Sequence, residues 1–199
     1  MIHTKKDLAD YLDADKKALC RCDTRPRLND FVWKFQIALR HLEFYTNKNG
    51  GVLYRLKYAY WKIKYQLFSI ICGFEIPVNC FGKGLSIAHR GTIVVNGNAR
   101  IGDNCRLHTC VNIGTSPGAS RLAPRIGNNV YIGPGVKIWG DIDIGNNVMI
   151  GANAAVGKDF PEGDCCIAGV PARIIKPKGR LEIENYYQSI ERQRRMHKT

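Results

Sequence analysis

The chain has 199 residues, of which 45% are hydrophobic and 24% charged, so it can bury a core and is not a disordered tail. Its 30 Lys and Arg residues outnumber 17 Asp and Glu residues, and the net charge of +13 suggests an anionic partner. Eight cysteines and five histidines form no C-x-x-C, H-x-x-x-H or Cys/His quartet, so we expect no zinc site and no other metal cofactor.

The start of the chain, "MIHTKKDLAD", is polar and charged where a signal peptide would be apolar. No later run approaches the roughly 18 apolar residues that are needed to span a bilayer. We therefore expect a cytoplasmic protein whose cysteines are reduced thiols.

Residues 1–73 follow a helical period, which predicts an α-helical N-terminal region. Thr4 and Asp7 have the spacing of a capping box at the start of a first helix. Asn29 is the expected cap of a second helix, and the turn signal "NKNGG" is its expected end.

The third predicted helix, Val52–Ile71, carries two apolar stripes on nearly opposite sides, with basic residues in the seams between them. The first stripe contains Leu56, Tyr60, Ile63 and Leu67, and the second contains Tyr54, Tyr58, Trp61 and Tyr65. One stripe can pack on the body of the protein, and the other needs a further partner. The alternatives are a neighbouring helix or subunit, an anionic glycan, or the inner face of the membrane. The charge accompanies no nucleic-acid-binding motif, so we expect no nucleic-acid partner.

From Val95 the period changes to six residues, which neither a helix nor an isolated strand explains. Seven of the ten repeated aliphatic residues are followed directly by glycine, which frees the backbone next to a corner. This pattern is typical of a hexapeptide repeat, in which stacked coils of short strands bury a continuous core. The repeated positions are Val95, Ile101, Leu107, Ile113, Ile126, Ile132, Ile138, Ile144, Ile150 and Val156.

The repeat predicts a mainly β fold, a parallel β-helix over 74–178 with a basic C-terminal helix or tail at 179–199. Between Ile113 and Ile126 the register breaks, because 13 residues stand where 6 or 12 would continue it. The segment Thr115–Arg125 is therefore expected to leave the wall as a loop.

These repeats, together with "IGANAAVGKDFP" and "AGVPARIIK", resemble the hexapeptide-repeat acyltransferases, and most closely their serine acetyltransferase-like branch. The resemblance implies a left-handed β-helix that assembles as a homotrimer, with active sites in clefts between subunits. It also implies the transfer of an acetyl group from acetyl-CoA, as a co-substrate, to a hydroxyl or an amine.

In that branch the motif that reads "AHRGTIVV" here supplies the catalytic base, which the resemblance assigns to His89. Imidazole has a suitable pKa to accept the proton of a hydroxyl that attacks a thioester. The turn "IGTS", Ile113–Ser116, is the candidate oxyanion site. His108 matches no motif of the family, and we expect it to line the cleft or the surface.

The resemblance also implies a groove for coenzyme A. Pro134 and Ala152 match its small lining residues and are 18 residues apart, as three hexads require. Basic side chains beside such a groove would contact the phosphates. The other matching positions are Gly157, Lys158, Arg173 and Lys176.

Three departures from the family pattern bear on the acceptor. Ala88 stands where serine acetyltransferases have an Asp, and "LAP" at 122–124 replaces the Arg-His-Pro that would grip a substrate carboxylate. The Asp that orients the base is also unmatched, and Glu75 is the candidate to orient His89 instead.

A sugar hydroxyl of a capsular or other surface polysaccharide is therefore the expected acceptor, because selective recognition does not survive the loss of its polar groups. The alternative is serine O-acetylation in cysteine biosynthesis. The third alternative is that the protein is a non-catalytic β-helix scaffold.

Overall fold

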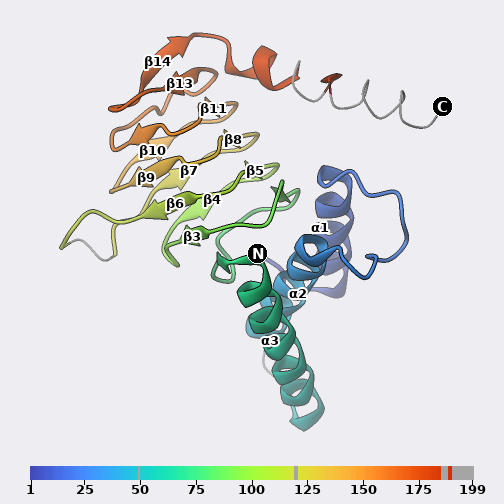
Figure 1. The fold of residues 1–199 in the computed structure, drawn as a ribbon. Helices are drawn as coiled ribbons and strands as arrows, with labels where there is room; N and C mark the ends of the chain where they lie inside the picture. The colour runs from blue at the N-terminus through green and yellow to red at the C-terminus, as the bar shows by residue number, and fades with distance from the viewer. Residues whose placement is uncertain (49, 119–120, 185–187, 190–199) are drawn as a thin grey trace.

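The computed structural model describes residues 1–48, 50–118, 121–184 and 188–189. Three helices come first, namely α1 (Lys5–Ala18), α2 (Phe31–Thr46) and α3 (Val52–Cys72). They lie against one end of a stack of short strands, and α3 runs on past that end (Figure 1).

The helix boundaries follow local capping chemistry. Thr4 and Asp7 form the predicted capping box, in which each side chain accepts a hydrogen bond from the other residue's backbone N–H. The cap of α2 is Asp30 rather than Asn29, and its side chain makes no capping hydrogen bond, so that expectation is wrong by one residue. At the end of α3, Gly73 adopts the left-handed conformation, with φ of 74°, that stops a helix.

The strands wind into a three-sided prism, because the chain changes sheet at every corner and returns to the same sheet one coil later. Sheet A has the order β1-β3-β6-β9-β12, sheet B the order β10-β7-β4, and sheet C the order β14-β13-β11-β8-β5-β2. The pairings are parallel except that β14 runs antiparallel to β13. The bounds are β1 Phe74–Glu75, β2 Ser86–Ile87, β3 Ile93–Val95, β4 Arg100–Ile101, β5 Arg106–Leu107, β6 Val111–Gly114, β7 Arg125–Ile126, β8 Tyr131–Ile132, β9 Lys137–Trp139, β10 Asp143–Ile144, β11 Met149–Ile150, β12 Ala155–Val156, β13 Cys166–Ala168 and β14 Arg173–Lys176.

The six-residue repeat supplies the core of this prism. All ten repeated aliphatic residues are buried, with exposed fractions between 0% and 4%. Each coil therefore adds one aliphatic side chain per sheet to a continuous interior. At one corner Asn104, Asn129 and Asn147 adopt positive φ and stack, with amide hydrogen bonds of 3.0 and 3.1 Å between neighbours. Asparagine tolerates this left-handed backbone better than most residues and so suits the corner.

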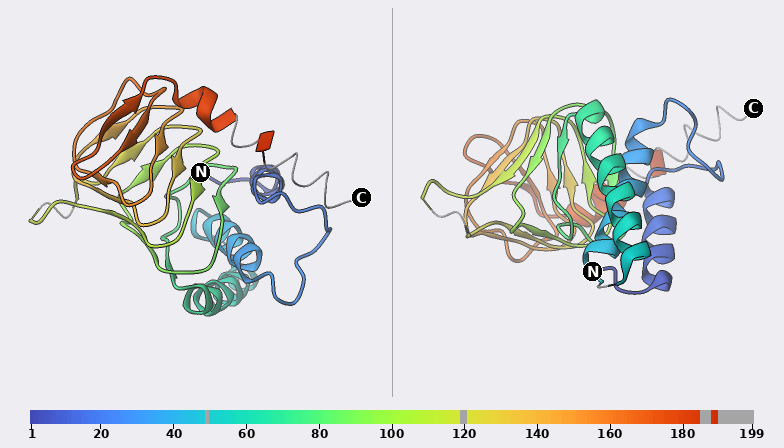
Figure 2. Two further views of the ribbon diagram at one scale, coloured as in Figure 1. Left: turned by 45° about the horizontal axis from the view of Figure 1, so that its top comes forward. Right: turned by 90° about the horizontal axis from the view of Figure 1, so that it is seen from below.

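A loop leaves the wall between β6 and β7 and projects outward in both views of Figure 2. The strand β7 begins at Arg125, which the sequence analysis includes in the loop. The Arg125 guanidinium lies 2.7 Å from Asp143 and 2.8 Å from Asp141, and these ion pairs hold it against sheet B.

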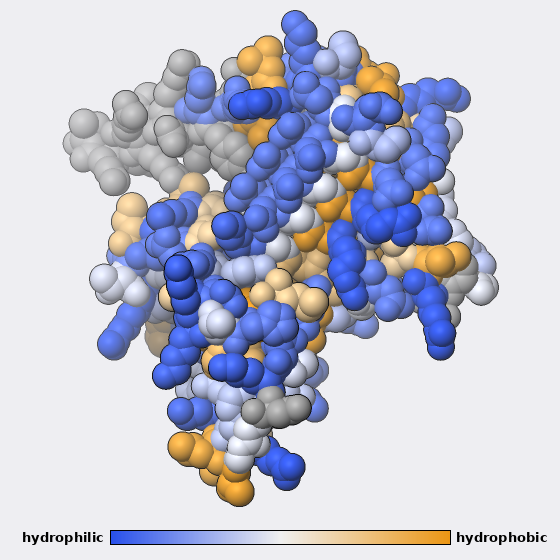
Figure 3. All heavy atoms as spheres, turned by 180° about the vertical axis from the view of Figure 1, so that it is seen from behind, coloured by the Kyte–Doolittle hydropathy of each residue, from blue (hydrophilic) through white to orange (hydrophobic). Residues whose placement is uncertain are grey.

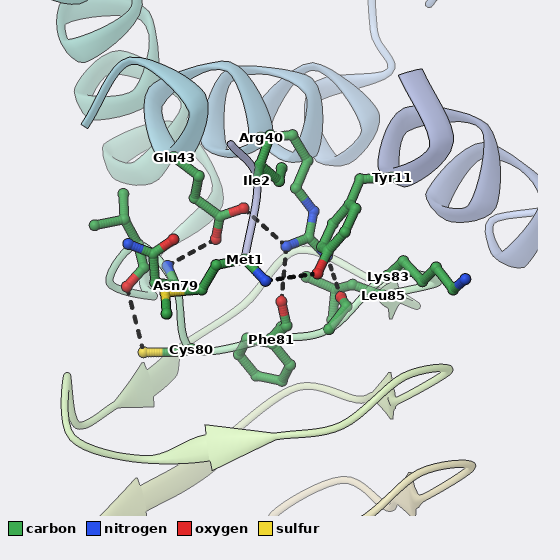
Figure 4. A network of polar contacts seen from close by, with 12 residues as sticks. Met1, Ile2, Tyr11, Arg40, Glu43, Asn79, Cys80, Phe81, Lys83 and Leu85 are labelled. Atoms are coloured by element: carbon green, nitrogen blue, oxygen red, sulfur yellow. Dashed lines mark hydrogen bonds and ion pairs between the residues drawn. The ribbon is translucent and has the colours of Figure 1, made fainter. Parts of the chain in front are cut away.

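One buried cation joins the helices to the first coil (Figure 4). Arg40 on α2 is fully buried, and its Nε and Nη1 lie 2.8 Å and 3.0 Å from the carboxylates of Asp15 and Glu43. Two further N–H groups donate to the backbone carbonyls of Phe81, at 3.0 Å, and Gly82, at 2.6 Å. Burial opposes the charge of Arg40, but the two carboxylates outweigh burial and raise its pKa above the ordinary value.

Residues of α1 and α2 also hold the backbone at the start of β2. Asp15 Oδ1 accepts a hydrogen bond from the Leu85 N–H at 2.9 Å, and Gln36 Nε2 donates to the Leu85 carbonyl at 2.7 Å. Ser86 Oγ donates to the Ala18 carbonyl at 3.1 Å. The helices therefore set the position of β2 and of the corner that follows it before β3.

After β14 a short helical segment covers 179–184. The remainder of the predicted basic tail, apart from 188–189, lies outside the described residues.

We expect Arg40→Met to lower the free energy of unfolding by about 3–5 kcal/mol, because it leaves two carboxylates buried without a cation. Urea denaturation measures the loss. The matched control is Arg125→Met, which removes an arginine whose ion pairs are half exposed and should change stability little. An equal loss for both variants would contradict the structural role given to Arg40.

Candidate active site

The corner between sheets C and A, the C/A corner, carries one residue of each coil at the same register. Strand pairing aligns Ile87, Leu107, Ile132 and Ile150. The residues two positions further along are His89, Thr109, Pro134 and Ala152. Three predicted site residues, His89, Pro134 and Ala152, thus lie in one row along the prism.

His89 lies at the outer side of this corner and is exposed, so it is not a core histidine. Among the described residues it makes no hydrogen bond, and none joins it to Glu75, whose side chain is exposed on β1. The structure therefore does not support Glu75 as the group that orients His89 within one chain. Ala88, which replaces the family's Asp, is partly buried beside it and offers no polar group.

His108 lies next to His89, with 6.2 Å between their ring centroids, and its ring is 5.1 Å from that of Tyr131. Its Nε2 is buried and has no hydrogen-bond partner within the part of the chain that the structure describes. Burial first, and then the positive charge of Arg106, lower the pKa of His108 to about 4. A neutral second imidazole thus stands beside the exposed one.

The sequence predicts His108 in the cleft or on the surface, close to one coil further on from His89. The coil that separates them is two residues longer than a coil of three hexads, since Ile87 pairs with Leu107 whereas Ile132 pairs with Ile150. The two rings lie close together but are tilted by 58° and not stacked.

Coils in such a stack are about 4.8 Å apart, so Pro134 lies roughly 10 Å and Ala152 roughly 14 Å along the prism from His89. Both side chains are exposed. Arg173 continues the row at the far end. Strand β13 ends at Ala168, the chain turns at the C/A corner of the last coil, and Arg173 then pairs with Ala168 as the first residue of β14. An exposed track of small residues thus runs from an imidazole to a guanidinium.

Other predicted positions lie elsewhere. Gly157 and Lys158 follow β12 at the corner between sheets A and B, the A/B corner. A side chain at Gly157 would bring its Cβ within 2.5 Å of the Trp139 ring, so this glycine makes room for the indole. Lys176 lies at the opposite end of β14 from Arg173, and its Nζ is 2.9 Å from Glu182.

The candidate oxyanion turn, Ile113–Ser116, also lies at the A/B corner, where β6 ends and the loop begins. A strand of four residues spans about 13 Å. Within one chain this turn therefore lies across sheet A from His89 and does not face it. In the loop itself Leu122 is half exposed, whereas Ala123 is buried in the core.

Two hollows formed by the described residues are lined by side chains other than His89. One, of about 380 Å³, lies on the outer face of sheet A and is lined by Thr92, Val94, Cys110, Val111, Asn112 and Lys137. A larger one, of about 640 Å³, lies between α1, the asparagine corner and the 179–184 segment. Among the described residues no group of three or more His, Cys, Asp or Glu side chains is placed to hold a metal ion.

Residues 123–158 match the family model described as bacterial transferase hexapeptide (six repeats). The chain is 33% identical over 147 residues to a serine acetyltransferase of Helicobacter pylori, an alignment that covers 69% of this chain and 86% of that protein. The chain belongs to the hexapeptide-repeat acyltransferases, in their serine acetyltransferase-like branch. This membership confirms the resemblance predicted from the sequence.

A second relative, the serine acetyltransferase of Synechococcus elongatus, is 37% identical over 116 residues, which cover 57% of this chain. The chain spans 47% of the length of that relative. A crystal structure of serine acetyltransferase in complex with coenzyme A, from Brucella abortus, superposes with a TM-score of 0.63 at 26% identity, and the match covers 86% of this chain and 69% of that one. The predicted fold class, a left-handed parallel β-helix behind α-helices, is confirmed.

We expect the His108 ring to titrate with a pKa of about 4 in the folded protein, below the 6.5 of a free histidine. Between these two pH values the unfolded chain binds more protons at His108 than the folded chain does. The free energy of unfolding that depends on a neutral, buried His108 therefore falls as pH falls from 6.5 towards 4. Nuclear magnetic resonance of the ring protons, assigned with His108→Gln, measures the midpoint. A midpoint near 6.5 would contradict the burial of this ring.

Proposed function

We propose that the protein is an acetyl-CoA-dependent O-acetyltransferase with His89 as its general base. The observation that carries the proposal is the row at the C/A corner, where an exposed imidazole begins a track of small residues that ends at Arg173. The length of this track suits an extended thioester arm with its phosphates at the basic end.

In the proposed reaction an imidazole nitrogen of His89 accepts the proton of the acceptor hydroxyl as its oxygen attacks the thioester carbonyl. The resulting tetrahedral oxyanion collapses, the carbon–sulfur bond breaks, and the leaving thiolate takes the proton back from the imidazolium. Atoms and charge balance without an acyl-enzyme, so no cysteine has to act as a nucleophile. The neutral His108 beside His89 adds no positive charge that would oppose protonation of the base.

We further propose that a neighbouring copy completes the site. The predicted residues fall on two corners, and one chain cannot bring them together. The candidate oxyanion turn lies one coil above His89, and Gly157 and Lys158 lie in the same coil as Ala152. The A/B corner of one copy would therefore meet the C/A corner of the next at matching levels, as a homotrimer allows.

Two acceptors are supported by different observations. The matched relatives are named serine acetyltransferases, which favours L-serine over the polysaccharide that the sequence analysis expects. The loop favours an acceptor without a carboxylate, because Leu122 and the buried Ala123 stand at the carboxylate-binding positions and Arg125 is engaged with aspartates. We propose serine as the first acceptor to test and a sugar hydroxyl as the second.

We expect His89→Ala to lower kcat by about 10²–10⁴-fold with an unchanged melting temperature, because the side chain is exposed and its loss leaves no cavity. Release of free thiol from acetyl-CoA measures the rate. The matched control is His3→Ala, an exposed histidine at the start of the chain. Wild-type turnover in His89→Ala would remove this residue from the mechanism.

Ala152→Glu should raise the KM for acetyl-CoA about tenfold or more, because it puts bulk and negative charge on the track of a polyanionic co-substrate. Isothermal titration with coenzyme A provides a binding readout that is independent of turnover. Ala9→Glu, at an exposed position of α1, serves as the matched control. Equal coenzyme A affinity in both variants would place the groove elsewhere.

Parallel assays with L-serine and with soluble bacterial surface glycans separate the acceptors. Saturable thiol release with serine supports the first acceptor, and release only with glycans supports the second. Absence of both coenzyme A binding and thiol release would overturn the enzyme proposal in favour of a scaffold.

A further inference from the structure

The helix α3 has two faces that differ in what they contact. On the inner face, the Trp61 ring stacks on His41 of α2 with 3.9 Å between centroids, and Tyr54 Oη donates to the Phe44 carbonyl at 3.0 Å. Tyr65 Oη donates to the Ile76 carbonyl at 2.7 Å. The aromatic stripe of α3 is therefore the one that packs on the body.

The opposite stripe remains uncovered along the length of the helix. Its large apolar side chains are between 39% and 76% exposed, which is far from their usual burial. Seen from behind, Figure 3 shows hydrophobic atoms next to hydrophilic ones at the tip of the part that projects below the body. The stripe, called the outer face of α3, consists of Val52, Leu53, Leu56, Tyr60, Ile63, Leu67, Ile70 and Ile71.

Basic residues border this outer face on both sides. At 3.6 residues per turn, Lys57 and Lys64 fall along one border, and Arg55 and Lys62 along the other. The helix contains no Asp or Glu at all. An apolar stripe between two basic borders suits a surface that is apolar inside and anionic at its edge, since Lys and Arg can lay their stems on apolar surface while their charges reach outward.

Two other occupants fit this face less well. A second α3 laid against the first would bring eight positive charges together without a carboxylate on either helix to balance them. Glycans stack on aromatic rings, but the rings of Tyr54, Trp61 and Tyr65 are turned to the body, and the outer face is mainly aliphatic.

Within the described part of the chain, no helix has both the length and the apolarity to cross a bilayer.

We propose that the outer face of α3 docks the protein onto an anionic lipid bilayer, with Leu56, Ile63 and Leu67 among the acyl chains and the basic borders on the headgroups. This inference does not depend on the acetyltransferase proposal, because it uses neither corner of the prism. The proposal also gives a role to the basic residues of α3, which are part of the excess positive charge of the N-terminal region.

Flotation of the full-length protein with vesicles tests the proposal. We expect binding to phosphatidylcholine vesicles that contain about one-third phosphatidylglycerol, weak binding to pure phosphatidylcholine, and loss of binding at high salt. Lys57→Glu with Lys64→Glu should weaken binding at least about fivefold per lysine. Leu56→Asp with Ile63→Asp should weaken it at least about tenfold, because the apolar contact is lost.

Two control variants match these changes at sites away from α3. Leu28→Asp alters a leucine that is 90% exposed before α2, and Lys5→Glu with Lys6→Glu reverses two charges on α1. Both should bind vesicles like the wild type, and circular dichroism spectra and thermal melting check that all variants fold.

The proposal is overturned if the wild type does not float with anionic vesicles at low salt, or if the α3 and control variants bind equally. It is also overturned if Leu56→Asp with Ile63→Asp changes the oligomeric state of a protein that ignores vesicles, which would assign the outer face to a second copy. Salt-sensitive binding to polygalacturonate without vesicle binding would assign it to a glycan.

Discussion

The buried guanidinium of Arg40 holds the helical region and the β-helix together. The first coil of a parallel β-helix has no coil beneath it, so its carbonyls and amides need other partners. Arg40 binds two of those carbonyls, and Asp15, which neutralises Arg40, accepts the Leu85 N–H. A charge this deep is stable only because its carboxylates and hydrogen bonds are complete. The position of β2, and with it the corner that bears His89, follows from this contact.

The sequence alone predicts most of the β-helix, because a side chain that must point inward at every sixth position leaves a pattern that the periods of a helix and of an isolated strand do not explain. It also predicts that α3 has two apolar sides and that Thr4 caps α1. It does not predict Arg40, since a lone arginine in a helix carries no sign of burial until its partners, Asp15 and Phe81, are brought together across distant parts of the chain.

The candidate site is predictable only in part, for a geometric reason. Motifs identify His89, Pro134 and Ala152, and the register places all three on one corner. The same reasoning cannot tell that Gly157 accommodates the Trp139 indole, because ring and glycine meet across neighbouring strands. It also cannot tell that Lys176 is paired with Glu182, a contact formed by a turn beyond the repeat. The repeat in the sequence predicts where the chain turns from one sheet to the next. Contacts between side chains on neighbouring strands depend on packing, which the repeat does not specify.

The antiparallel course of β14 has a consequence for assembly. Every other strand offers its edge to a following coil in the same direction, so an unmodified last coil would present a ready template for another prism. By folding back on β13, the chain replaces that template with an edge of opposite polarity, and the helices occlude the other end. Filament growth by end-to-end stacking of prisms is thereby disfavoured.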